Sequence, residues 1–426
     1  MAEPSKVIPI DPWSPGQPWE PVRTPSRFRN ALSKYRVWRS DSRCIKCGRC
    51  TEVCPYGVHT KAGGYIRRPK SYLCMGTACQ DKPFYCVANC PADALRVSVH
   101  PVYATLGDSR WTPDLLLSTW WQAEFGTLPY NGLEYRTGDS GGGFDRMRFI
   151  FPTRARDFKL SHDDISLDLE LNRRGDGRPQ VTLSVPWYGG GMSFGSVSIN
   201  TILSRVQAAR RFNTLMSTGE GGYPEALYAF DHHVVTQVAT GLFGVREDTI
   251  QRVRMVEFKY AQGAKPGLGG HLLGDKVTPA VARMRESVAG AALFSPFPFH
   301  SVYSVEDHKK HLDWIKQINP RALVAVKVST PTDVDMVAVG SYYAGAHVVQ
   351  LDGSYGGTGA APDIAKKNIA MPIEYAIPKA HRFLVEEGVR GEVALIVSGG
   401  IRSPNDLVKA IALGADGVVI GTAELV

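Results

Sequence analysis

The sequence predicts an α/β protein in two parts: a (β/α)8 TIM barrel preceded by a small cysteine-rich domain. Three observations lead to this prediction. The chain has 426 residues, which is enough for about two to four domains. Its eight cysteines all lie between Cys44 and Cys90. From about residue 181 onward, short β-branched apolar runs alternate with segments of helical period, a pattern typical of parallel βαβ units.

Four regions follow one another along the chain. Residues 1–40 form a Pro- and Trp-rich extension, residues 41–100 hold the cysteines, residues 101–180 form a connector, and residues 181–426 form the barrel. The composition, 43% hydrophobic and 21% charged, is that of an ordinary globular chain and excludes disorder. No apolar run reaches the roughly 18 residues of a membrane helix, and the N-terminus has no apolar signal core. We therefore expect a cytoplasmic protein that does not bind a membrane.

The cysteines fall into two runs of four. The first run, Cys44, Cys47, Cys50 and Cys54, ends in a proline and has the spacing of bacterial ferredoxins. The second run, Cys74, Cys79, Cys86 and Cys90, also ends in a proline but has wider intervals. Disulfides are one alternative, although four thiols within eleven residues cannot all pair with good geometry. Zinc is another, because it shares the Cys-x2-Cys spacing. The pattern favours two [4Fe–4S] clusters in a small α+β, bacterial-ferredoxin-like domain.

The likeness to two-cluster ferredoxins also implies which cysteines share a cluster. In those proteins the fourth cysteine of each run binds the other cluster. Carried over, one cluster uses Cys44, Cys47, Cys50 and Cys90, and the other uses Cys54, Cys74, Cys79 and Cys86. Such clusters transfer single electrons, so we expect an acceptor further along the chain.

Eight candidate strands define the barrel. They are Ser184–Tyr188, Thr214–Thr218, Met255–Ala261, Ala291–Ser295, Leu323–Ser329, His347–Asp352, Val393–Ser398 and Gly417–Gly421. Helical segments lie between them, for example Glu306–Ile318, Tyr375–Glu387 and Pro404–Leu413. Eight β/α units predict a TIM barrel. Because the chain ends shortly after the eighth strand, we expect the eighth helix to be missing, either because the chain is a fragment or because a partner supplies it.

Glycine-rich segments follow nearly every predicted strand, at the end of the barrel where active sites of this fold lie. Glycines allow the backbone to approach a large flat ligand, and the last two loops of such barrels often bind phosphate. This combination predicts flavin mononucleotide (FMN); a plain phosphosugar site is the alternative, but it would need no iron–sulfur donor. The residues expected at the flavin are Met192, Ser193, Thr218, Gln262, Lys327, Asp352, Gly353, Gly356, Gly357, Thr358, Gly359, Ser398, Gly399, Gly400, Gly421 and Thr422.

The barrel segments resemble the flavin domain of glutamate synthase. The resemblance is carried by residues 192–195, 217–222, 262–270, 274–279, 352–359 and 398–421, and it covers about 181–426. Together with the cysteine-rich domain, the chain resembles the short archaeal-type glutamate synthase rather than the long bacterial chain.

The resemblance implies reductive amination. 2-Oxoglutarate and ammonia form 2-iminoglutarate, and reduced FMN delivers a hydride to give L-glutamate. The positions expected to take part are Glu220, Lys265, His271 and Arg285. Lys265 and Arg285 would hold the dicarboxylate, Glu220 would handle protons during imine formation, and Lys327 would stabilise the charge of the reduced flavin. Two of these residues have alternative roles that involve no catalysis. Arg285 could be a solvated helix residue, and Glu220 could serve only to anchor its loop.

The sequence departs from the family at positions that concern the substrate and the partners. His271 stands where the family usually has Gln. The chain begins Met-Ala, without an N-terminal Cys nucleophile, so ammonia would diffuse in or come from a separate glutaminase (amidotransferase) subunit. No cysteine follows Cys90 to hold the three-iron cluster of the large enzymes, so electrons would reach FMN from the N-terminal clusters. No Rossmann fingerprint is present, so we expect a separate electron donor, a ferredoxin or a reductase subunit, rather than direct use of NADPH.

The sequence leaves two other functions and one other partner to consider. A methylglutamate synthase would use the same barrel with another amine, but that group lacks the ferredoxin module. An electron-transfer subunit would relay electrons through its flavin and would need no grip on a dicarboxylate. The formal net charge of +8 raises the possibility of nucleic-acid binding. The basic residues are scattered, however, and two clusters and a flavin phosphate would neutralise roughly six charges, so we expect no nucleic-acid partner.

Overall fold

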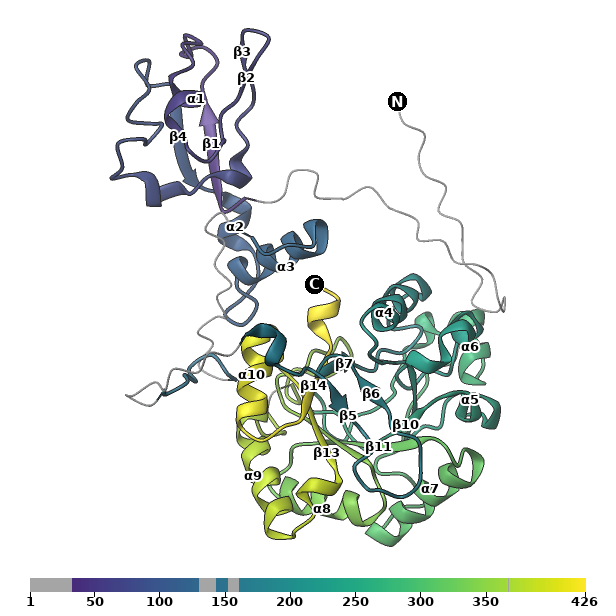
Figure 1. The fold of residues 1–426 in the computed structure, drawn as a ribbon. Coiled ribbons are helices and arrows are strands. Elements are labelled where there is room, and N and C mark those ends of the chain that lie inside the picture. Colours follow the sequence, from purple (N-terminus) through teal and green to yellow (C-terminus); the bar gives the residue numbers. More distant parts are fainter. Residues whose placement is uncertain (1–32, 130–142, 152–160, 367) are drawn as a thin grey trace. The chain divides into compact units, whose positions relative to one another are not determined.

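The structure is a computed structural model that describes residues 33–129, 143–151, 161–366 and 368–426 (Figure 1). Residues 1–32, most of the predicted N-terminal extension, lie outside this part of the chain. Contacts divide the chain into two units, which are centred on residues 21–141 and 142–425. The division falls inside the predicted connector. Within the described residues, no helix has both the length and the apolar character that crossing a membrane requires.

The small unit is built around one antiparallel strand pair. Strand β1 (Tyr35–Arg39) pairs with β4 (Leu95–Val99). Between them lie α1 (Arg49–Val53), β2 (Lys61–Ala62), β3 (Tyr65–Ile66) and the 3-10 turns η1 (Ser71–Leu73) and η2 (Gly76–Cys79). Helices α2 (Pro101–Thr105) and α3 (Pro113–Phe125) follow. The buried core consists of Val37, Val58 and Leu95 with cysteine side chains packed against it, so the apolar core of this unit is small and its cysteines are part of it.

The large unit is a closed barrel of eight parallel strands, which confirms the predicted TIM barrel (Figure 1). The strands are β7 (Trp187–Gly189), β8 (Met216–Ser217), β9 (Val234–Ala239), β10 (Met255–Lys259), β11 (Leu323–Ser329), β12 (Val348–Asp352), β13 (Ala394–Ser398) and β14 (Gly417–Ile420). Since all strands run the same way, their C-terminal ends and the loops after them meet at one end of the barrel.

Helices and turns connect the strands. They are α4 (Ile199–Arg211), η4 (Glu225–His233), α5 (Glu247–Arg252), η5 (Gly274–Lys276), α6 (Pro279–Arg285), α7 (Val305–Ile318), α8 (Val334–Tyr343), α9 (Ile373–Glu386), η6 (Arg390–Glu392) and α10 (Pro404–Ala412). Pro404 occupies the first turn of α10 and Gly414 follows its end with φ of 119°, as the sequence predicts. After β14 comes the 3-10 turn η7 (Thr422–Glu424).

One predicted strand is wrong and one real strand was missed. Ala291–Ser295 is no barrel strand: Leu293 makes only an isolated antiparallel bridge to Leu272. Its side chain packs in a local cluster with residues of α6, so the apolar run there serves that cluster. The missing strand is β9, whose six residues are all buried. It follows η4 without a glycine or proline boundary, which hides its start in the sequence.

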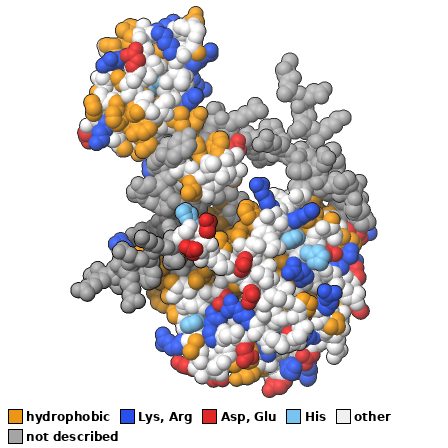
Figure 2. Space-filling model, in the orientation of Figure 1, with side chains coloured by type: hydrophobic (Ala, Val, Ile, Leu, Met, Phe, Trp, Pro, Cys, Tyr) orange, Lys and Arg blue, Asp and Glu red, His pale blue; other side chains and the backbone are white. Residues whose placement is uncertain are grey.

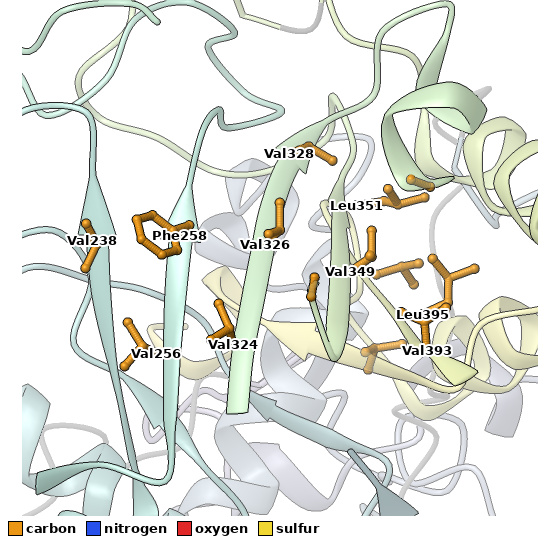
Figure 3. Packing of buried hydrophobic residues seen from close by; sticks show 14 of the residues in the cluster. Val238, Val256, Phe258, Val324, Val326, Val328, Val349, Leu351, Val393 and Leu395 are labelled. Atoms are coloured by element: carbon orange, nitrogen blue, oxygen red, sulfur yellow. The ribbon is translucent and has the colours of Figure 1, made fainter. Parts of the chain in front are cut away.

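The barrel has two apolar layers because strand side chains alternate between its two faces. Val324, Val326 and Val328 of β11 belong to the cluster between strands and helices (Figure 3). Leu323 and Ala325 belong to a second cluster inside the barrel. The hairpin of β5 (Leu169–Glu170) and β6 (Thr182–Leu183) adds its leucines to this inner cluster. The end of the predicted connector is therefore part of the barrel core.

Candidate functional site

The eight cysteines line two separate cavities in the small unit. The first is lined by Cys44, Cys47, Cys50 and Cys90, and the second by Cys54, Cys74, Cys79 and Cys86. Each set takes three cysteines from one run and the fourth from the other run. This is the crossed grouping that the resemblance to two-cluster ferredoxins implies. The empty volumes are similar, about 350 and 330 Å³, so the two cavities suit the same kind of group.

The arrangement of the thiols suits a cluster better than a single ion. All eight cysteines are free. Across the described ranges, His, Cys, Asp and Glu side chains form no group of three or more that could hold a metal ion. Zinc requires four ligands about 2.0–2.3 Å from one point, whereas here each set of sulfurs surrounds a cavity. Burial raises the pKa of Cys74 to about 11 and that of Cys86 to about 12. Because their pKa values are raised, these thiols keep their protons until a metal binds and displaces the protons.

The barrel interior is polar near the C-terminal ends of the strands and apolar near their N-terminal ends. Inward-facing residues near the C-terminal ends of the strands are at most 8% exposed. They are Gln237, Glu257, Lys259, Lys327, Gln350, Asp352 and Ser398. They alternate along their strands with the valines, leucines and phenylalanine of the outer layer (Figure 3). Polar groups buried in this way need partners, and the strands place these groups where they can meet.

Lys327 and Asp352 form the centre of this polar layer. The Lys327 Nζ lies 3.5 Å from Asp352 Oδ2 across neighbouring strands. Ser398 Oγ donates to Asp352 Oδ1 at 2.7 Å, and the Gly263 N–H donates to Oδ2 at 3.0 Å. Burial alone would lower the pKa of Lys327, but Asp352, Glu257 and Glu220 outweigh it and raise that pKa. The mouth of the barrel therefore holds a fixed positive charge.

A second charged group surrounds Glu220, in the loop after β8. Lys259 Nζ donates to Glu220 Oε1 at 2.9 Å, and the Gly270 N–H donates to the same oxygen at 3.2 Å. The other oxygen, Oε2, is buried and has no hydrogen-bond partner. Burial raises the pKa of Glu220, but the positive charges of Lys259, Lys265 and Arg285 lower it by more than burial raises it. The net shift of the pKa is therefore downward. Glu220 is thus an ionised carboxylate with one unused oxygen.

Glu220, Lys259 and Lys265 line one cavity of about 250 Å³ at the barrel mouth. Gln262 and Phe297 also line it. Lys265 is 6% exposed, and burial together with the nearby Lys259 lowers its pKa. An ordered carboxylate and two lysines around one cavity provide charges for an anionic substrate and a group that can exchange protons.

Arg285 contributes a further cation with spare donors. Its Nη2 donates to Ser193 Oγ at 3.0 Å, whereas Nε and Nη1 are buried without partners. Burial lowers the pKa of this guanidinium, and Glu220 acts in the opposite direction. Arg285 is 3% exposed, so it is no solvated helix residue. Buried donors without partners are costly, and they indicate that a ligand completes the site.

Two glycines of these loops, Gly263 and Gly399, lie where neighbouring loops pack closely. A Cβ added at Gly263 would lie 2.1 Å from the Asp352 carbonyl oxygen, and one at Gly399 would lie 2.4 Å from that of Gly353. These contacts join the loops after β10, β12 and β13. The glycines therefore let the loops pack against one another. By contrast, a Cβ at Gly421 would meet nothing within 4 Å, so the surface there is open to a ligand.

The other predicted flavin residues lie in loops at this same end of the barrel. Met192, Ser193 and Thr218 follow β7 and β8; Gly356, Gly357, Thr358 and Gly359 follow β12; Gly400 and Thr422 follow β13 and β14. The loops after β12 and β14 touch, because a Cβ at Gly357 would lie 2.3 Å from Thr422 Oγ1. His271 is placed apart from the Glu220 cavity lining, with its ring 5.3 Å from that of Phe294.

Four polar residues of the site, Gln237, Glu257, Lys259 and Gln350, were not predicted from the sequence. Lys259 pairs with Glu220, while Glu257 accepts a hydrogen bond from Gln237. Burial raises the pKa of Glu257. The signal was present: β10 reads Met-Val-Glu-Phe-Lys, with two charges in an otherwise apolar strand of a buried sheet. Charged residues are almost never fully buried unless they are paired.

Comparisons with known proteins agree with this geometry. Residues 153–426 match the family described as a conserved region in glutamate synthase, and residues 39–59 match a 4Fe-4S binding domain. The chain is 36% identical over 431 residues to an archaeal-type glutamate synthase [NADPH] of Thermotoga maritima, covering 93% of this chain and 81% of that protein. It is 34% identical over 419 residues to the archaeal glutamate synthase [NADPH] of Methanocaldococcus jannaschii, covering 92% and 80%. It is also 38% identical over 242 residues to the glutamate synthase [NADPH] large chain of Azospirillum brasilense, covering 55% of this chain and 16% of that one.

Proposed function

The chain belongs to the glutamate synthase family, and on that premise we propose that its barrel mouth makes L-glutamate from 2-oxoglutarate and ammonia. The observation that supports this most directly is a set of buried polar atoms without partners, on Glu220 at the lining of its cavity and on Arg285, whose charge acts on Glu220. Glu220 Oε2 and two nitrogens of Arg285 lack partners, and Lys265 is close enough to lower the pKa of Glu220. A dicarboxylate substrate supplies the acceptors that these cations require.

The residues of the barrel mouth fit FMN. The polar layer of Lys327, Asp352, Gln350 and Ser398 offers donors and acceptors to the polar edge of a flavin ring, and the open backbone at Gly421 leaves room for its phosphate. When bound, the flavin supplies hydride-transfer chemistry. In this proposal, the part of Lys327 is to hold a positive charge beside the ring, and Asp352 keeps that ammonium in place.

The cysteine cavities fit two [4Fe–4S] clusters, which supply single electrons when bound. We assign Cys44, Cys47, Cys50 and Cys90 to one cluster and Cys54, Cys74, Cys79 and Cys86 to the other. Burial raises the pKa of Cys50, and the positive charge of Arg39, which lines the first cavity, acts against that rise without reversing it.

The proposed roles of the substrate-binding residues follow from their partners. Lys265 and Arg285 hold the two carboxylates of the keto acid. Glu220, ionised because Lys259 donates to it, accepts a proton from ammonium at Oε2 and returns it as water leaves the carbinolamine. A chain that only relays electrons would have no use for these buried charges, so the alternative of a relay subunit is less well supported.

Two partners complete the proposal. Ammonia comes from solution or from a separate glutaminase subunit. Electrons come from a separate donor, a ferredoxin or a reductase subunit; the relatives named above carry NADPH in their names, which makes NADPH a candidate for the source of those electrons.

The test is anaerobic. The full chain is reconstituted with iron, sulfide and FMN, reduced chemically and mixed with 2-oxoglutarate and ammonium. We expect rapid flavin reoxidation and one L-glutamate per flavin, and we expect Lys265→Ala to abolish both. Methylamine in place of ammonium tests the methylglutamate synthase alternative. A flavin that binds but stays reduced with either amine would contradict the proposal.

A further inference from the structure

The positive charge of the chain is concentrated in one place. Residues 33–100 contain twelve Lys and Arg residues but only four Asp and Glu residues, an excess of eight. The whole chain has a net charge of +8, so the remainder is formally neutral. Two thiolate-bound clusters would remove about four of these charges and leave the small unit basic. The expectation of scattered basic residues is therefore wrong for this unit, whose visible face carries Lys and Arg along its edges (Figure 2).

The two cysteine cavities differ in what surrounds them. The cavity of Cys44, Cys47, Cys50 and Cys90 is also lined by Arg39, Lys46 and Arg49. The other cavity has apolar and aromatic neighbours, among them Tyr56, Phe84 and Tyr85, and no charged side chain in its described lining. The positive charges around the first cavity therefore attract a negatively charged partner toward that cavity rather than toward the second.

The surface over the first cavity has an apolar centre and a basic rim. Ile45 and Tyr65 are 66% and 65% exposed, and Cys47 is exposed beside them. The Lys46 Nζ lies 5.4 Å from the centre of the Tyr65 ring. The Lys61 Nζ lies 3.7 Å from the position that a Cβ on Gly48 would occupy, between Cys47 and Arg49.

The rim charges are only partly neutralised by the acidic residues described in the unit. Asp41, Glu52 and Asp93 lie 3.6–3.8 Å from Arg39, Arg49 and Arg43, so each acidic residue faces an arginine. Lys46 and Lys61 have no acidic partner in the described part of the chain and are exposed. An exposed apolar centre within unpaired positive charge is the usual composition of a small, transient docking surface for an acidic protein.

We propose that this surface, formed by Ile45, Lys46, Arg49, Lys61 and Tyr65, docks a small acidic one-electron carrier protein. The reduced carrier loses one electron and the cluster of the first cavity gains it, with no bond made or broken. The exposed Cys47 makes this the cluster that such a carrier can approach. This inference rests on the proposed function for the presence of clusters, and it adds the class of donor and the place where it binds.

The test uses the full chain, reconstituted with iron and sulfide, and a plant-type [2Fe–2S] ferredoxin of acidic surface as the probe. Binding is measured by the fluorescence anisotropy of labelled ferredoxin at low and high salt. The variant Lys46→Glu/Lys61→Glu reverses the rim, and the control Lys82→Glu/Arg96→Glu makes the same charge change elsewhere on the unit. We expect at least a tenfold weaker Kd for the first and less than threefold for the second at low salt, with both differences fading at high salt.

Two further readouts separate the possible outcomes. Carbodiimide cross-linking should join ferredoxin carboxylates to Lys46 or Lys61, and reduction of the clusters by ferredoxin should slow in parallel with binding. Lys46→Gln/Lys61→Gln should fall between the wild type and the reversed variant, provided that iron and sulfide contents are unchanged. Equal losses in both double variants, a larger loss in the Lys82 variant, or tighter binding of a DNA duplex than of ferredoxin would each overturn the inference. If no clusters assemble in the unmodified chain, it is the proposed function that fails; if a neutral photoreductant reduces them but ferredoxin does not bind, only the docking surface fails.

Discussion

Asp145 and Arg402 form an ion pair in which both side chains are almost fully buried, at 0% and 1% exposure. Asp145 precedes the barrel strands, whereas Arg402 lies in the loop after β13 that carries Gly399 and Gly400. Lys409 Nζ of α10 donates to the carbonyl of Phe144 at 2.8 Å and holds the same segment. The segment around Asp145, predicted as connector, is therefore anchored to a loop that we expect to hold the flavin phosphate.

Removing Asp145 should destabilise the barrel strongly. Asp145→Ala removes one of the two carboxylates that pair with the buried Arg402 guanidinium, the other being Asp406 at 3.3 Å, and removing a partner from a buried ion pair typically costs about 3–5 kcal/mol of unfolding free energy. Urea unfolding followed by tryptophan fluorescence measures the change. Asp313→Ala is the control, because it breaks the exposed pair with Lys309 and should cost less than about 1 kcal/mol. Asp145→Asn keeps an oxygen that can accept from Arg402 and should recover part of the loss, and equal stability of Asp145→Ala and the wild type would contradict the structural role.

Lys259 should control the acid side of the pH profile. Burial alone would raise the pKa of Glu220, but the ammonium groups of Lys259 and Lys265 and the guanidinium of Arg285 keep it below its ordinary value. Lys259→Met removes the nearest cation, so that pKa rises and the carboxylate is lost at a higher pH. We expect the acidic limb of kcat/KM for ammonium to move toward neutral pH. The exposed variant Lys309→Met should leave the limb in place, and an unshifted limb in Lys259→Met would argue against ionised Glu220 as the proton acceptor.

The same carboxylate links stability to pH. A Glu whose folded pKa lies below its unfolded value of about 4.3 stabilises the fold above that value, and this contribution disappears as the pH falls through the folded pKa. Glu220→Gln should therefore flatten the loss of stability between about pH 5 and pH 3. Thermal unfolding at a series of pH values checks this, with Glu247→Gln on the exposed start of α5 as the comparison.

Arg285 should determine the affinity for the keto acid. Arg285→Lys keeps the charge but loses the planar fork whose Nε and Nη1 are free to bind a carboxylate. Charge-assisted hydrogen bonds contribute about 1.5–3 kcal/mol, so we expect KM for 2-oxoglutarate to rise about 10- to 100-fold with a smaller change in kcat. Arg283→Lys alters an exposed position of the same helix and should have little effect. A fall in kcat at constant KM would instead place Arg285 in the reaction itself.

Single cysteine substitutions should reveal the crossed ligand sets. Cys54 lines the same cavity as Cys79, although it belongs to the run of Cys47. The electron paramagnetic resonance spectrum of reduced Cys54→Ser should therefore match that of Cys79→Ser and differ from that of Cys47→Ser. Cys90→Ser should match Cys47→Ser. If Cys54→Ser resembled Cys47→Ser, each run would bind its own cluster and the crossed assignment would be wrong.

Much of the fold and part of the site could be predicted from local sequence. Strands β11, β12 and β13 were predicted to within one residue, because each is a short, mainly apolar run that contains valine or isoleucine and has clear boundaries. The four-cysteine run of Cys44 and the loop of Glu220 carry spacing that is diagnostic in itself. Strand β9 escaped because no turn residue separates it from η4, and Ala291–Ser295 was misassigned because a local apolar cluster produces the same short apolar run.

The sequence by itself determined the class of the protein: two cysteine runs, eight β/α units and the glycine-rich segments of one family. Only the tertiary structure decided how distant residues act on one another. It paired Lys259 with Glu220, crossed the two cysteine runs, tied Asp145 to the β13 loop and left Lys46 and Lys61, beside the first cluster cavity, with no acidic partner among the described residues. The physical reason is that motifs depend on spacing along the chain, whereas ion pairs, ligand sets and charged surfaces depend on distances in space that barrel closure and loop packing set.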